Sequence, residues 1–273
     1  MPKTHRIASP VLGPYVKWVS GFIKVSAESF SLLDHVQRPE ILDEDSKAFH
    51  TFFNLSVNAE ATSLAARVAA THSLAVPAFA LARVRLEQCI ISSFLIHAPQ
   101  EEGIRRYLGH QPVQMNTVFK KYKSHFQTGW DMANLEKDAH EAQARFKDSR
   151  FKRVWTPLEL PEMAARRDAL AKEISPLPWK LADEYWSLYP LTSLAVHGAS
   201  ETVLWQGEFH EPELGSGLRY PYMLPERARW IMSAVARLDL IQAYETLSRL
   251  EGASENSIKP LMDAYRGAAE ASA

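Results

Sequence analysis

The sequence predicts an all-α protein, folded as an irregular bundle of about seven to nine helices. Apolar residues recur at spacings of three, four and seven along most of the chain, which is typical of amphipathic helices. Of the 273 residues, 46% are hydrophobic and 23% are charged, as expected of a folded globular protein. No repeat, low-complexity segment or linker stands out. We therefore predict one helical domain covering residues 1–273.

Three long helices are expected in the first hundred residues. The first lies between Pro14 and Pro39. The second begins near Asp43 or Asp45, since acidic residues suit the positive end of a helix. The third carries Pro77 in its first turn and stops before a proline at position 99.

The middle of the chain is more polar. Two polar helices are predicted within 107–153, divided near Gly129, and a further helix covers about 161–173. Another helix, 178–197, contains Pro190, which removes one backbone hydrogen bond and clashes with the preceding turn. We expect a kink or a break at this proline.

The stretch after residue 204 has no helical period. Glycine, proline and aromatic residues fill it as far as position 224, and Gly215–Ser216–Gly217 is a suitable turn. This composition predicts one inserted loop or small hairpin. A strong helix over 225–250 follows, with a short alanine-rich helix after Gly252.

Charge and cysteine content limit the class of protein. The formal net charge is −1, so any nucleic-acid site has to be a local basic patch. Cys89 is the only cysteine, which excludes an intramolecular disulfide and favours a reducing cytoplasm. No apolar run reaches the roughly 20 residues that a membrane span requires. We expect a cytoplasmic protein that does not enter the membrane.

Common catalytic and cofactor motifs are absent. The sequence has no glycine-rich phosphate loop, no hydrolase nucleophile elbow and no Glu-x-x-His pair for a bundle metal site. We therefore predict no cofactor and no metal. An acidic patch in the loop is better interpreted as solvated than as a metal site; it comprises Glu208, His210, Glu211 and Glu213.

Two segments suggest partners. A local run of Lys120, Lys121 and Lys123 is a candidate for contact with RNA, although such a run is more often only a solvated helix face. Aromatic residues in the loop could anchor a homo-oligomer or pack back onto the bundle; they are Trp205, Phe209, Tyr220 and Tyr222. Light scattering before and after Trp205→Ala would distinguish these alternatives.

One polar constellation remains. Tyr185, Tyr189, Ser193 and His197 are four residues apart and form a stripe on one helix face. Buried hydroxyl and imidazole groups require hydrogen-bond partners. Arg83 and Glu87, also four apart, share one face of a largely apolar helix, where charged side chains are expected to be paired. We predict that the two helices meet in one polar network.

These segments carry a resemblance. A-R-V-R-L-E (82–87), F-K-x-x-W (151–155) and the Tyr185–Gly198 stripe resemble bacterial domain-of-unknown-function family 5677 over about 50–205. The resemblance implies a helical fold and no defined activity. A more distant likeness to HEPN-like folds, which include ribonucleases of toxin–antitoxin and phage-defence systems, is an analogy of fold alone.

The network allows two interpretations. In one, His197 acts as a general acid or base and Arg83 stabilises a phosphate, as in metal-independent RNA cleavage. In the other, the network only holds the bundle together, which is commoner. Our leading hypothesis is a helical binding or regulatory protein in bacterial stress or phage defence. The alternatives are a HEPN-like ribonuclease and an oligomeric scaffold, so enzymatic activity stays open.

Overall fold

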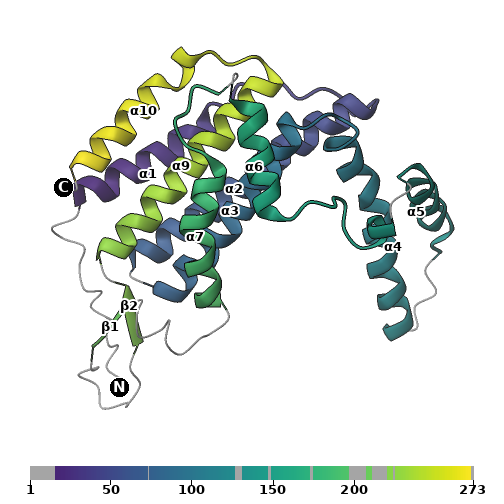
Figure 1. The fold of residues 1–273 in the computed structure, drawn as a ribbon, viewed down its shortest axis with the longest axis horizontal. Helices are drawn as coiled ribbons and strands as arrows, with labels where there is room; N and C mark the ends of the chain where they lie inside the picture. The colour runs from purple at the N-terminus through teal and green to yellow at the C-terminus, as the bar shows by residue number, and fades with distance from the viewer. Residues whose placement is uncertain are drawn as a thin grey trace, which may run out of the picture.

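A computed structural model describes residues 16–72, 74–126, 131–146, 149–172, 175–196, 207–210, 220–223 and 225–271. Over these residues the fold is all-α, as predicted, and consists of many helices with two short strands (Figure 1). The elements are α1 (Val16–Ser31), α2 (Glu44–Thr71), α3 (Ala75–His97), α4 (Ile104–Phe126), α5 (Ala133–Arg145), the 3-10 turn η2 (Ser149–Lys152), α6 (Leu160–Ala171), α7 (Leu181–Val196), β1 (Gly207–His210), β2 (Tyr220–Met223), α9 (Pro225–Leu250) and α10 (Glu255–Glu270).

The central helix of the bundle is α3. It packs against α2, α9, α7 and α6, while α1 and α10 lie together along α9. Apolar side chains on several sides of α3 are buried, among them Phe79, Cys89 and Leu95. A helix with apolar residues around most of its circumference is stable only when other helices surround it.

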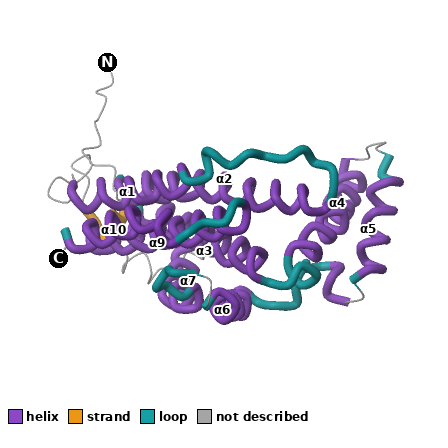
Figure 2. The backbone as a smooth tube through the Cα atoms, turned by 90° about the horizontal axis from the view of Figure 1, so that it is seen from above, coloured by secondary structure: helices purple, strands orange, loops and turns teal. Residues whose placement is uncertain are grey.

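The polar helices α4 and α5 pack against each other and lie at one end of the molecule, away from α1 and α10 (Figure 2). This agrees with the prediction of two polar helices divided near Gly129, although residues 127–130 are outside the described residues. A small separate apolar cluster lies where these two helices meet the η2 turn; it comprises Val113, Ala139, Phe146 and Phe151. A small core of this kind suffices for helices that are mostly solvated.

Local sequence signals explain several helix ends. Asp43 is the N-cap of α2: its carboxylate accepts a hydrogen bond from the backbone N–H of Ser46, and the Ser46 hydroxyl accepts one from the N–H of Asp43. This reciprocal pair satisfies two backbone donors that the helix cannot. Pro77 lies in the first turn of α3, where a missing N–H costs little.

Of the kink or break predicted at Pro190, the break is wrong. Helix α7 continues from Leu181 to Val196 with Pro190 inside it. The proline is exposed, so solvent can hydrate the backbone carbonyl that loses its partner. The neighbouring Leu188 and Thr192 are buried and hold both halves of the helix against the bundle.

The hairpin predicted after residue 204 is present as an antiparallel pair of strands. Gly207 of β1 lies opposite Met223 of β2, and His210 lies opposite Tyr220. The Gly215–Gly217 turn is outside the described residues. Within the described part of the chain, no helix is both long enough and apolar enough to span a bilayer.

Candidate functional site

The predicted contact between α3 and α7 centres on the guanidinium of Arg83. Its Nη2 donates a hydrogen bond to the hydroxyl of Tyr189 at 2.9 Å, and its Nη1 donates to Oγ of Ser193 at 3.2 Å. Its Nε donates to Oε1 of Glu87, one turn along α3, at 3.0 Å. The structure therefore brings four of the residues selected from the sequence into one hydrogen-bonded group.

Aromatic rings extend this group along α7. The ring of Tyr185 stacks on that of Tyr189, with centroids 4.7 Å apart and an interplanar angle of 20°. The guanidinium carbon of Arg83 lies 4.6 Å from the centroid of the Tyr189 ring, which is close enough for a cation–π interaction. Tyr185 thus belongs to the group through its ring. Burial, followed by the neighbouring Tyr189, raises the pKa of Tyr185 above that of an ordinary tyrosine.

Arg83 remains a cation in this environment. Burial by itself opposes the charge, but the hydrogen bonds to Glu87 and Tyr189 outweigh it and raise the pKa of Arg83 above its ordinary value. The side chain is 19% exposed and that of Glu87 is 32% exposed. Two hydroxyl groups and a carboxylate therefore hold a permanent positive charge in place at the edge of the bundle.

His197 lies outside the described residues, one position beyond the end of α7. The catalytic role predicted for it with Arg83 stays a prediction. Trp205 also lies outside the described residues, whereas Phe209 is on β1 and Tyr220 and Tyr222 are on β2.

The basic run is on α4. Lys120 pairs with Glu136 of α5 at 3.1 Å, and Lys120 and Lys121 line an open hollow with Ser124 and His125. Lys123 lies in the last turn of the same helix. The positive charge of the run is thus partly neutralised by α5, and contact with RNA stays a prediction. Among the described residues, no group of three or more acidic, histidine or cysteine side chains could hold a metal ion.

A second ionic group, which the sequence interpretation missed, is sealed inside the bundle. Arg85 is 0% exposed and lies two residues from Arg83, on the opposite side of α3. Its Nε donates to Oγ of Ser63 on α2 and to Oδ1 of Asp239 on α9, both at 2.8 Å. Its Nη1 donates to Gln242 at 2.7 Å, also on α9.

Two further buried ion pairs join α9 to the helices beside α3. Arg237 donates to both carboxylate oxygens of Glu184 on α7, at 2.6 and 2.9 Å. Arg167 of α6 pairs with Glu245. In the sequence, these ion pairs are indicated only by charged residues within apolar helical segments. That pattern does not identify which residue pairs with which.

Comparison with known proteins places the chain in a family. The model of a family of unknown function, DUF5677, matches residues 49–208. The chain belongs to this family. The match begins in α2, ends in β1 and includes the whole Arg83 network. No curated protein and no solved structure matches the chain.

Proposed function

We propose that this DUF5677 protein binds a protein partner through α7 and the adjoining edge of α3. One observation carries the proposal: the fixed cation of Arg83 lies beside an exposed apolar stripe on α7. Trp186, Pro190 and Leu194 are four residues apart and are all exposed. Each of these residues comes directly after one of Tyr185, Tyr189 and Ser193 in the sequence. The apolar stripe and the hydroxyl stripe therefore lie next to each other along α7.

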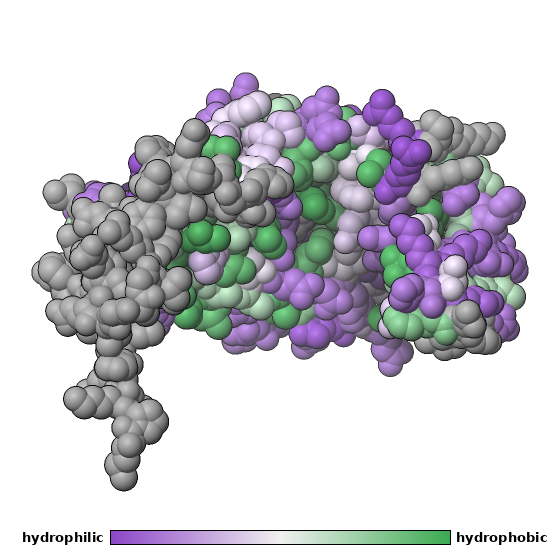
Figure 3. Space-filling model, turned by 90° about the horizontal axis from the view of Figure 1, so that it is seen from below, coloured by the Kyte–Doolittle hydropathy of each residue, from purple (hydrophilic) through white to green (hydrophobic). Residues whose placement is uncertain are grey.

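The apolar side chains of this surface are accessible to a partner. Trp186 is 66% exposed, and Val84, next to Arg83, is 43% exposed. Exposed aromatic residues next to a fixed arginine are typical of the residues that contribute most to binding. Figure 3, a view of the molecule from below, shows apolar side chains gathered among polar ones across the middle of one face. A partner segment with apolar residues and one acidic group would complement this surface.

A capture experiment tests this proposal. The wild-type protein and Trp186→Ala are immobilised in parallel, and the proteins retained from an extract of the native host are quantified by mass spectrometry. We expect at least one protein to be retained by the wild type and reduced about ten-fold or more with Trp186→Ala. Leu42→Ala is the matched control, because Leu42 is a large exposed apolar residue away from α7. Identical profiles for the wild type and Trp186→Ala would contradict the proposal.

Metal-independent RNA cleavage by His197 and Arg83 is the second candidate. It is favoured by the position of Arg83, a permanent and partly exposed cation bonded to Ser193, four residues before His197. Such a cation could stabilise the negative charge on phosphate in the transition state. The protein is incubated with total RNA in EDTA, alongside His197→Ala. Cleavage that the variant loses supports a ribonuclease; no cleavage by the wild type excludes it.

The bacterial stress or phage-defence setting is proposed from family resemblance alone. Expression of the wild-type protein and of His197→Ala in a bacterial host tests the ribonuclease version of it. Growth inhibition by the wild type that the substitution relieves would connect the setting to His197. Equal growth of both strains would show that His197 has no part in such a setting.

A further inference from the structure

A second site lies at the opposite end of α3 from the Arg83 network. The N-terminal part of α2, the turn before α4, the start of α4 and the last turn of α9 line an open pocket of about 320 Å³. This volume is at the lower end of the range of pockets that hold small molecules, about 300–1,000 Å³. The pocket therefore suits a ligand of the size of an amino acid.

The floor of the pocket is apolar. Phe52 and Ile104 line it and belong to a buried hydrophobic cluster with Ala48. Phe49 and Leu250 line its sides. A ligand that occupies the pocket must therefore present an apolar body to these side chains, since burying an unpartnered polar group against them would be unfavourable.

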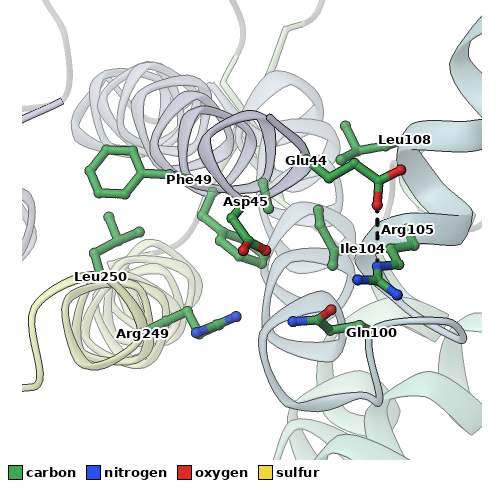
Figure 4. A pocket seen from close by; sticks show the side chains of 11 residues that line it. Glu44, Asp45, Phe49, Gln100, Ile104, Arg105, Leu108, Arg249 and Leu250 are labelled. Atoms are coloured by element: carbon green, nitrogen blue, oxygen red, sulfur yellow. Dashed lines mark ion pairs between the residues drawn. The ribbon is translucent and has the colours of Figure 1, made fainter. Parts of the chain in front are cut away.

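The polar residues of the pocket include two carboxylates and two guanidinium groups. Glu44 and Arg105 pair with each other at 3.3 Å, as the dashed line in Figure 4 shows. Arg105 also pairs with Glu101, at 2.7 Å. These charges satisfy one another within the protein and close one side of the pocket.

The other two charged residues that line the pocket are Asp45 and Arg249. Neither has an ion-pair partner within 4 Å among the described residues, and they do not pair with each other, although the charge of Asp45 helps to raise the pKa of Arg105. In Figure 4 the Arg249 side chain, from α9, points toward Gln100, and Asp45 extends toward the space between them from α2. The guanidinium carbon of Arg249 lies 5.9 Å from the centroid of the Phe52 ring, which keeps this cation above the apolar floor. Both side chains are exposed, so one solvated charge of each sign borders the same apolar space and is accessible to a ligand.

We propose that this pocket binds a small zwitterion with an apolar body, of which an apolar α-amino acid is the simplest example. The ligand carboxylate accepts hydrogen bonds from Arg249, and its ammonium group donates to Asp45. Its side chain lies on Phe52 and Ile104. A guanidinium group binds a carboxylate with two parallel hydrogen bonds, which would orient the ligand. This site is separate from the proposed partner-binding surface of α7, so either proposal can fail without the other.

Isothermal titration calorimetry with L-phenylalanine and L-leucine tests the proposal on the full chain. We expect saturable binding of at least one of the two. Two analogues of phenylalanine test the need for both charges: 3-phenylpropanoate lacks the ammonium group and 2-phenylethylamine lacks the carboxylate. Each is expected to bind about ten-fold more weakly or worse, because each leaves one charged group of the protein without a partner.

Substitutions locate the binding site. Arg249→Gln and Asp45→Asn are each expected to weaken binding about ten-fold or more. Arg266→Gln and Asp263→Asn remove an exposed arginine and an exposed aspartate from α10, far from the pocket in sequence, and should leave binding unchanged. The proposal is overturned if neither amino acid binds at millimolar concentration, if either analogue binds as tightly as phenylalanine, or if binding survives both pocket substitutions.

Discussion

Arg85 has no exposed surface, yet every hydrogen-bonding nitrogen of its guanidinium has an acceptor on α2 or α9. A charge in the interior of a protein is tolerated only when it is paired in this way. The stability of the bundle consequently depends on Asp239 staying opposite Arg85.

We expect Arg85→Met to lower the free energy of unfolding by about 3–5 kcal/mol, because it leaves the Asp239 carboxylate buried without its cation. The double variant Arg85→Met/Asp239→Leu should recover about 2 kcal/mol of this loss, since neither charge then remains. Denaturant unfolding measures both. Arg266→Met, which removes an exposed arginine, should change stability by less than about 0.5 kcal/mol. A double variant no more stable than Arg85→Met would contradict this explanation.

A second residue couples folding to pH. The His97 side chain is 7% exposed, and its Nε2 lies 3.3 Å from Oε1 of Glu245. Burial, and then the positive charge of Arg167, lower the pKa of His97 from 6.5 to about 4. The folded protein therefore contains a neutral imidazole at pH values where the unfolded chain has begun to take up a proton.

The free energy of unfolding should accordingly fall as the pH drops from 6.5 toward 4, because the unfolded state binds one more proton in this window. The loss attributable to His97 amounts to about 3 kcal/mol at most. In His97→Gln this contribution disappears and the pH dependence becomes shallower. Urea unfolding at a series of pH values measures how steeply the free energy of unfolding changes with pH. His140 is exposed, so His140→Gln should show the same pH dependence as the wild type. Equal slopes for His97→Gln and the wild type would rule out His97 as the source.

Arg83 and Arg85 show what a sequence can predict at the scale of a residue. The contact of Arg83 with α7 could be predicted because Arg83 and Glu87 share a helix face and the hydroxyl stripe of α7 has the same spacing. The partners of Arg85 on α9 are about 150 positions away. No local pattern indicates which face of α3 meets α9, so the larger buried network could only be seen in the structure.

The helices themselves were largely predictable, because capping residues and apolar spacing act within one turn. The cap at Asp43 and the polar character of α4 and α5 are examples. The helix does not break at Pro190, and the reason is physical. The local cost of a proline inside a helix is a few kcal/mol, and the burial of Leu188 and Thr192 on either side offsets it.

At the scale of elements, α1 and α10 make an unusually close contact. A Cβ atom added at Gly21 of α1 would lie 2.6 Å from Cβ of Ala268 on α10. Alanine favours a helix over glycine by about 1 kcal/mol, but separating two packed helices costs about 1–3 kcal/mol. We expect Gly21→Ala to lower the free energy of unfolding by about 1 kcal/mol.

Gly267, on the same helix as Ala268, is the matched comparison. A Cβ atom added there meets nothing within 4 Å. Gly267→Ala should therefore raise the free energy of unfolding by about 0.5–1 kcal/mol through helix propensity alone. Thermal and denaturant unfolding of the two variants should thus change in opposite directions. Stabilisation by both substitutions would show that α1 and α10 are not packed closely at Gly21.

For the molecule as a whole, α9 is the element that holds the family segment together. Its residues Arg237, Asp239 and Glu245 pair with α7, α3 and α6 respectively. The family match ends at residue 208, before α9 begins at Pro225. The segment that matches the family model thus contains buried charges whose partners lie on α9, outside the match.

The isolated segment 49–208 is consequently expected not to fold. Without α9, Arg85, Glu184 and Arg167 lose their principal partners, and the apolar residues of α3 that face α9 become exposed to water. The exposed apolar surface is the larger loss, because its burial is the dominant favourable contribution to folding and a domain is usually stable by only about 5–15 kcal/mol. Far-UV circular dichroism with a thermal melt compares the segment with the full chain. A cooperative melt of the segment alone would show that the family helices form their own core and that the ion pairs to α9 are dispensable.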